Sequence, residues 1–199
     1  MKDSTRTQTV RDAILDATDE LLNRFGYRKM TIDDLAQNVG IGKGTVYLYF
    51  PSKEEIALSH IDRIVERLKS KLWNIANSDM SPARKIKEML IERVLFRFDS
   101  VQHYTAGLNE LLANIRPRLL DRRNRYFEEE ARIFARVLDE EQNREKFVGD
   151  PLENARLLLL ATNSLLPYSL STTELGVRPE IESKINHLAD VLLSGIVRR

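Results

Sequence analysis

Apolar residues recur every three or four positions along most of the chain, whereas the strict alternation of a half-buried strand is scarce. This pattern predicts an all-α protein. Residues 1–8 are polar and are expected to form a flexible arm. The expected helices, several of them bounded by glycine or proline, cover residues 10–25, 32–39, 43–49, 54–76, 83–102, 104–114, 119–146, 152–172 and 179–198.

Hydroxyl-bearing residues mark the starts of several of these helices. Thr31 and Ser52 are each followed, three residues later, by an acid, which is the spacing of a capping box. Thr9 is expected to cap the first helix in a similar way, and Gly26 to end it. The expected buried stripe of the first helix consists of Ile14, Ala17, Leu21 and Phe25.

Residues 31–53 predict two short helices joined by a tight turn at Gly40, Ile41 and Gly42, which is the arrangement of a helix-turn-helix. The second of these helices contains two tyrosines and no acid, more aromatic surface than seven residues can bury on one face. Val46 and Phe50 are expected to point into the core. The expected DNA contacts are Thr31, Gly42, Lys43, Gly44, Thr45, Tyr47, Leu48, Tyr49 and Lys53.

Each of these residue types has a physical use on DNA. Glycines let the backbone approach a phosphate closely, and hydroxyls bond phosphate oxygens or base edges. Lys43 and Lys53 would neutralise phosphates and release counterions. Residues 1–60 hold nine acids and eight bases, which is less basic than many DNA-binding domains. No acid falls between Leu35 and Lys53, however, so the expected reading surface is itself free of negative side chains.

Residues 10–58 resemble the DNA-binding domain of TetR-type transcriptional regulators. The family's usual serine before Lys-Gly is Gly42 here, so one hydroxyl for a phosphate is missing. The matching residues are Ile14, Ala17, Phe25, Gly26, Thr31, Ile32, Leu35, Ala36, Gly40, Lys43, Gly44, Thr45, Tyr47, Tyr49, Phe50 and Lys53.

The resemblance implies a helical homodimer. Residues 1–53 would form a three-helix DNA-binding domain, and residues 54–199 a helical domain for dimerisation and ligand binding. A small-molecule effector would change the separation of the two DNA-binding domains. The implied function is a repressor that leaves a palindromic operator in double-stranded DNA when its effector binds.

Four successive leucines, residues 157–160, cover the whole circumference of their helix, and the last expected helix has a further apolar stripe. Both helices could lie deep in a monomer core. Two successive helices with surplus apolar surface fit better in a four-helix interface between two chains. The expected interface residues are Leu158, Leu159, Leu188, Leu192 and Ile196.

The effector pocket has no comparable signal, because each candidate taken singly is as readily a core residue. A basic cluster at residues 116–125 could hold an anion, but the acids that follow it favour an ion-paired surface. The expected pocket residues are Trp73, Phe96, Tyr104, Tyr126, Phe127, Asn163 and Tyr168.

Enzyme chemistry has little support in this sequence. There is no cysteine, the three histidines are scattered, and neither a glycine-rich phosphate loop nor a nucleophile elbow is present. We therefore expect no catalytic, metal or cofactor site. Without an apolar leader or a membrane-length apolar run, the expected location is the cytoplasm. The alternative function is a helical protein–protein adaptor that keeps the fold without reading DNA.

Overall fold

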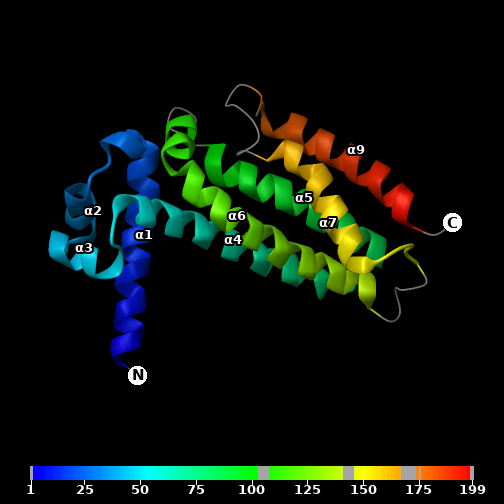
Figure 1. Ribbon diagram of the computed structural model, residues 1–199, viewed down its shortest axis with the longest axis horizontal. Coiled ribbons are helices and arrows are strands. Elements are labelled where there is room, and N and C mark those ends of the chain that lie inside the picture. The colour runs from blue at the N-terminus through cyan, green and yellow to red at the C-terminus, as the bar shows by residue number, and fades with distance from the viewer. Residues whose placement is uncertain (1, 103–107, 141–145, 167–173, 175, 198–199) are drawn as a thin grey trace. The chain divides into compact units, whose positions relative to one another are not determined.

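The computed structural model describes residues 2–102, 108–140, 146–166, 174 and 176–197. Within these ranges the chain is helical apart from turns and one isolated antiparallel bridge between Phe147 and Val197, which confirms the all-α prediction (Figure 1). The helices are α1 (Lys2–Lys29), α2 (Ile32–Val39), α3 (Lys43–Tyr49), α4 (Lys53–Ala76), α5 (Pro82–Val101), α6 (Leu108–Asp139), α7 (Pro151–Thr162), the 3-10 turn η3 (Asn163–Leu165) and α9 (Arg178–Ile196).

The chain divides into two compact units. The first comprises residues 1–63 and 103–119, and the second residues 64–102 and 120–199. Helices α4 and α6 each contribute residues to both units. The first unit therefore takes in the start of α4 and of α6, whereas the sequence predicted a domain boundary after residue 53.

The first unit has a small core to which α1, α2 and α3 each contribute (Figure 1). The expected capping box at α2 is confirmed: the Asp34 N–H donates to Thr31 Oγ1 at 3.1 Å, and the Thr31 N–H donates to Asp34 Oδ2 at 2.9 Å. The Ser52 cap on α4 is confirmed as well, because Ser52 Oγ accepts from the Glu55 N–H at 3.1 Å. The fully buried residues of this core include Ile14, Leu15, Met30, Leu35, Val46 and Phe50.

Three expectations for α1 are wrong. The helix already begins at Lys2, so residues 2–8 are helical and Thr9 lies inside the helix rather than at its cap. Phe25 is 41% exposed and lies outside the core, with the guanidinium of Arg24 4.9 Å from the centroid of its ring. Gly26 does interrupt the helix as expected, with a φ of 73° that few other residues adopt.

The expected break near Pro117 is also wrong, because α6 is continuous from Leu108 to Asp139. Proline removes one helical hydrogen bond, which leaves the carbonyl of Ala113 without its partner. Both residues are exposed, so water can satisfy that carbonyl and the helix continues.

The second unit contains a larger core, in which α5 packs on α9 and α7 packs on both (Figure 1). Prolines lie in the first turns of α5, α7 and α9, where their missing N–H costs no helical bond, as the sequence predicted. The α-helical part of α7 ends at Thr162, earlier than expected, and the last residues of the expected helix lie outside the described ranges. No helix among the described residues has the length and apolarity that a membrane span requires. Leu72, Ile86, Met89, Leu90, Val94, Phe134, Val137, Leu159 and Ile185 are among the fully buried residues of this core.

Candidate nucleic-acid interface and effector region

The turn between α2 and α3 is set by backbone conformation. Gly40 adopts a left-handed conformation (φ 74°, ψ 34°), which a side chain would strain. The N–H of Ile41 then donates to the carbonyl of Ala36 at 2.9 Å and closes the end of α2. Gly42 returns the chain to an extended conformation (φ −74°, ψ 148°), from which α3 begins.

Helix α3 has one buried face and one exposed face. Val46 and Phe50 are buried, as predicted. Tyr47 is 48% exposed and Leu48 is 83% exposed, while Tyr49 is half-buried. Large exposed side chains on a short helix are not needed for the core, and they leave α3 with an apolar and aromatic outer surface. The contact of this surface with DNA stays a prediction.

Within the first unit, no neighbouring atom would exclude a side chain at Gly42 or Gly44. A Cβ at Gly44 would meet nothing within 4 Å, and one at Gly42 would meet only Thr45 Oγ1, at an ordinary 3.9 Å. Both have negative φ, so the backbone does not demand glycine either. The space beside both residues is open to an approaching molecule.

Lys43 forms an exposed ion pair with Asp33, with 2.6 Å between Nζ and Oδ2. This hydrogen bond, together with the charge of Asp33, raises the pKa of Lys43, so the ammonium remains charged. Exposed ion pairs contribute little free energy, because water solvates both charges. A phosphate could therefore replace Asp33 at low cost.

Lys53, expected as a phosphate contact, has a different role in this structure. Its ammonium donates to the backbone carbonyls of Tyr27, Arg28 and Met30 at 2.9, 3.3 and 3.1 Å, so all three of its protons are used. It also lies 4.5 Å from the centroid of the Tyr27 ring. Burial lowers the pKa of Lys53, which the charge of Glu110 partly opposes. Lys53 thus satisfies carbonyls at the end of α1 and is not available to a phosphate.

Thr31 is exposed, but its hydroxyl is already engaged. It donates to Asp34 Oδ2 at 2.7 Å, and this bond, with that from the Thr31 N–H, lowers the pKa of Asp34. The first role of Thr31 is therefore to start α2. The surface that remains for a partner consists of Gly42, Lys43, Gly44, Thr45, Tyr47, Leu48 and Tyr49.

The helix-turn-helix segment matches a known protein family. Residues 14–59, which contain the turn and all of α3, match the family described as bacterial regulatory proteins, tetR family. The helix-turn-helix segment of the chain therefore has the sequence of the DNA-binding domain of this family. The match stops short of the second compact unit.

Two curated relatives are similar to part of this chain. The transcriptional regulator EthR of Mycolicibacterium smegmatis is 40% identical over 76 residues, 38% of this chain and 35% of the relative. The transcriptional repressor KstR of the same organism is 31% identical over 80 residues, 40% of this chain and 39% of the relative. The chain thus matches little more than a third of either relative's length.

A crystal structure of a TetR-family regulator from Mesorhizobium loti has the same fold over nearly the whole chain. The TM-score is 0.70 at 18% sequence identity, covering 97% of this chain and 99% of that one. At such low sequence identity, this similarity is evidence for a shared fold alone. It confirms that a helical second domain follows the helix-turn-helix.

The expected effector residues that the structure describes lie in the second unit. Trp73, Phe96 and Phe127 are half-buried against its core, whereas Tyr126 and Asn163 are buried. Tyr104 and Tyr168 lie outside the described residues. A shallow hollow of about 220 Å³ has none of the expected residues in its wall, which is formed by Leu138, Asp139, Phe147, Gly149, Pro151 and Asn154. Which aromatic residues line a pocket remains a prediction.

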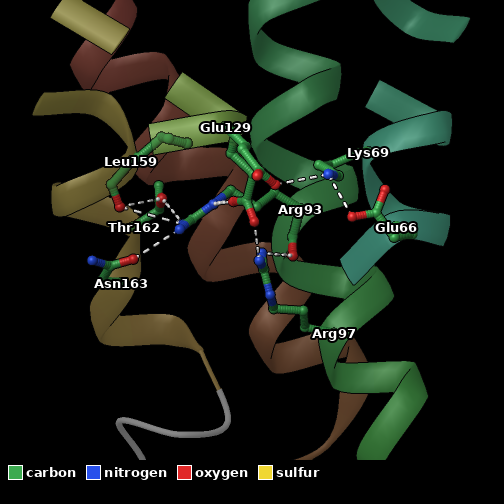
Figure 2. Close-up of polar contacts among 9 residues, drawn as sticks. Glu66, Lys69, Arg93, Arg97, Glu129, Leu159, Thr162 and Asn163 are labelled. Carbon is green, nitrogen blue, oxygen red and sulfur yellow. Dashed lines mark hydrogen bonds and ion pairs between the residues drawn. The ribbon is translucent and has the colours of Figure 1, made fainter. Parts of the chain in front are cut away.

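A buried ionic cluster, Arg93 with Glu130 and Arg97, was not anticipated (Figure 2). Arg93 is 1% exposed and Glu130 fully buried, with 2.7 Å between Arg93 Nε and Glu130 Oε2. Arg97 donates through Nη2 to the other carboxylate oxygen. Burial alone would raise the pKa of Glu130, but the charges of Arg97 and Arg93 outweigh burial and lower it. The carboxylate is therefore ionised.

The same cluster joins α5 and α6 to the end of α7 (Figure 2). Arg93 donates through Nη1 to Thr162 Oγ1 at 2.9 Å and through Nη2 to Asn163 Oδ1 at 2.8 Å. Asn163, which was expected in a pocket wall, thus accepts a hydrogen bond from Arg93. A sequence signal did exist: Arg93 and Arg97 fall on the apolar stripe of α5, three and seven residues after Leu90.

Two of the expected interface residues belong to the core of the unit itself. Leu158 and Leu159 are 2% and 0% exposed, so they offer no surface to a second chain. Leu188, Leu192 and Ile196 are partly buried. The exposed apolar residues of α7 and α9 are instead Leu157, Leu160 and Val191, each between 55% and 61% exposed.

The basic cluster at residues 116–125 is ion-paired where the structure describes its contacts. Arg118 donates to Glu54 Oε2 at 3.2 Å and to Glu55 Oε2 at 2.9 Å. Arg125 lies 4.0 Å from a carboxylate oxygen of Glu129. These contacts support the expectation of an ion-paired surface.

Proposed function

We propose that the protein is a homodimeric repressor that binds a palindromic operator and leaves it when a small-molecule effector binds the second unit. The observation that carries the proposal is the outer face of α3, where Tyr47 and Leu48 are exposed on a helix whose other face is fixed in a core. A helix presented in this way fits the major groove of DNA. The repressor activity of KstR supports the direction of control.

The chemistry of α3 suits both parts of DNA recognition. Lys43 and the hydroxyls of Thr45 and Tyr49 would contact phosphates, and the open backbone at Gly44 would let a phosphate approach. Leu48 would meet a thymine methyl, and the Tyr47 hydroxyl a base edge. The dimer would present two such helices to two half-sites about one helical turn apart or further.

The dimer would form through α7 and α9. Leu157 and Leu160 lie one turn apart on α7, and Val191 lies on α9, which packs against α7. Two such helix pairs would bury these side chains in a four-helix interface. The partly buried Leu188, Leu192 and Ile196 would border it.

Selection of duplexes from a random-sequence library by the full-length protein tests the proposal. The expected result is enrichment of a two-fold symmetric sequence. Binding to it should weaken steeply with salt, because displaced counterions accompany each phosphate contact. Failure to enrich any sequence would contradict DNA reading. It would favour the alternative, a protein–protein adaptor that uses exposed Leu48 to contact a helical partner.

A further inference from the structure

We propose that Arg11, on α1, binds a DNA phosphate beside the C-terminal end of α3. The inference rests on the proposed function, since it adds a residue of another helix to the same interface. It starts from a cation–π contact, in which the guanidinium carbon of Arg11 lies 5.0 Å from the centroid of the Phe50 ring. Arg11 was not among the DNA contacts expected from the sequence.

The packing of Phe50 restricts where this guanidinium can lie. Phe50 is 1% exposed and directly follows Tyr49, the last residue of α3. A free arginine side chain is long and flexible, but attraction to a ring that is held in a core keeps its guanidinium beside that ring. Arg11 is half-buried in this position. Less conformational entropy is then lost when the guanidinium binds an anion.

The hydrogen-bond donors of Arg11 are available to such an anion. A guanidinium carries five N–H donors, and none of those of Arg11 has an acceptor among the residues whose side chains the structure describes. None of its nitrogen atoms is fully enclosed by the protein, so a molecule at the surface can reach them. Arginine binds phosphate through two N–H groups at once, which makes a phosphate a fitting partner.

The position of Arg11 complements that of Lys43. Lys43 begins α3 and Phe50 follows its last residue, so the two cations lie at opposite ends of a helix about 10 Å long. Phosphates border the major groove, which is about 12 Å wide, on both sides. A helix with a cation at each end can therefore contact both strands. Lys53, which the sequence suggested for a phosphate, instead donates to three backbone carbonyls.

The test measures how binding of the full-length protein to a random-sequence duplex depends on salt, because phosphate contacts do not depend on base sequence. Arg11→Met keeps an unbranched, polarizable side chain beside the Phe50 ring but removes the charge and the donors. At about 0.1 M salt its affinity should be about 5–10-fold weaker than that of the wild type. The slope of log affinity against log salt should fall by about one, the loss expected for one phosphate. Arg11→Lys, which keeps the charge, should retain the wild-type slope.

The matched control is Arg24→Met, which should leave affinity and slope nearly unchanged. Arg24 also lies on α1 and its guanidinium is 4.9 Å from the centroid of Phe25, but it is about 20 Å along the helix from Arg11. Circular dichroism should show that all three variants are folded. An unchanged slope in Arg11→Met, or an equal reduction in Arg24→Met, would overturn this inference alone. A wild-type protein that binds no duplex would refute the proposed function and this inference together.

Discussion

The ammonium of Lys53 lies 2.9 Å from the carbonyl oxygen of Tyr27, at the end of α1. Lys53 is the first residue of α4, so this contact ties the start of α4 to α1. A lysine used in this way stabilises the DNA-binding unit. Lys43, on the exposed start of α3, is the lysine of this pair that we propose contacts DNA.

The two lysines should therefore respond differently to the same substitution. Lys53→Met should lower the free energy of unfolding by about 1–3 kcal/mol, because hydrogen bonds to a charged group are lost from the α1 carbonyls. Lys43→Met should leave the free energy of unfolding nearly unchanged and reduce the slope of log affinity against log salt by about one. Urea unfolding and anisotropy titrations measure the two quantities. A reduced salt slope in Lys53→Met alone would reverse the assignment.

Gly44→Ala should change the stability of the protein and its affinity for operator DNA in opposite directions. Alanine is favoured over glycine inside a helix by about 0.5–1 kcal/mol, and its Cβ would meet no neighbour within 4 Å, so the protein should become more stable. The added methyl group would obstruct a phosphate, so operator affinity should fall. Urea unfolding and operator titration on one preparation check both changes. Unchanged affinity would mean that DNA does not approach Gly44.

The buried carboxylate should dominate the stability of the second unit. Glu130→Gln removes the buried carboxylate that Arg93 and Arg97 share and should cost about 3–5 kcal/mol. The matched control is Glu66→Gln, whose carboxylate is 65% exposed in its ion pair and should cost less than about 1 kcal/mol. Denaturant unfolding compares the two variants. Similar small costs for both would contradict the importance of the cluster.

Glu130 also gives stability a pH dependence of known sign. Its pKa is lower in the folded protein than in the unfolded chain, so the unfolded state takes up a proton first as the pH falls. This contribution is complete above the ordinary pKa range of glutamate and is lost as the pH falls through the lowered value. Unfolding free energy measured across this acidic range should decline less in Glu130→Gln than in the wild type. An equal decline would exclude Glu130 as a source of acid sensitivity.

Leu160→Glu should weaken the dimer without unfolding the monomer, because Leu160 is 61% exposed in the single chain and would enter an apolar interface. Leu120→Glu, at a leucine that is 43% exposed on α6, serves as the control and should remain dimeric. Sedimentation equilibrium at micromolar concentration distinguishes them. A monomeric wild-type protein would refute the proposed interface.

The parts of the fold that depend on local chemistry could be predicted from the sequence. The capping box at Thr31, the turn at Gly40 and the inward face of α3 follow from neighbouring residues, and the structure confirms them. Lys53 could not be assigned in this way, because its acceptors lie more than 20 residues earlier. The Arg93–Glu130 pair spans 37 residues, and its geometry depends on how three helices pack. Leucines 157–160 showed a helix with excess apolar surface, but only packing decides which leucines remain exposed.

We propose that the outer face of α3 reads DNA sequence. The most direct measurement is a comparison of operator affinity and of the selected consensus for the wild type, Tyr47→Phe and Leu48→Ala. Both side chains are exposed, so both variants should fold normally. We expect about 2–10-fold weaker operator binding for Tyr47→Phe, equivalent to one hydrogen bond, and loss of preference at one symmetric pair of positions for Leu48→Ala. Wild-type affinity and an unchanged consensus in both variants would contradict it.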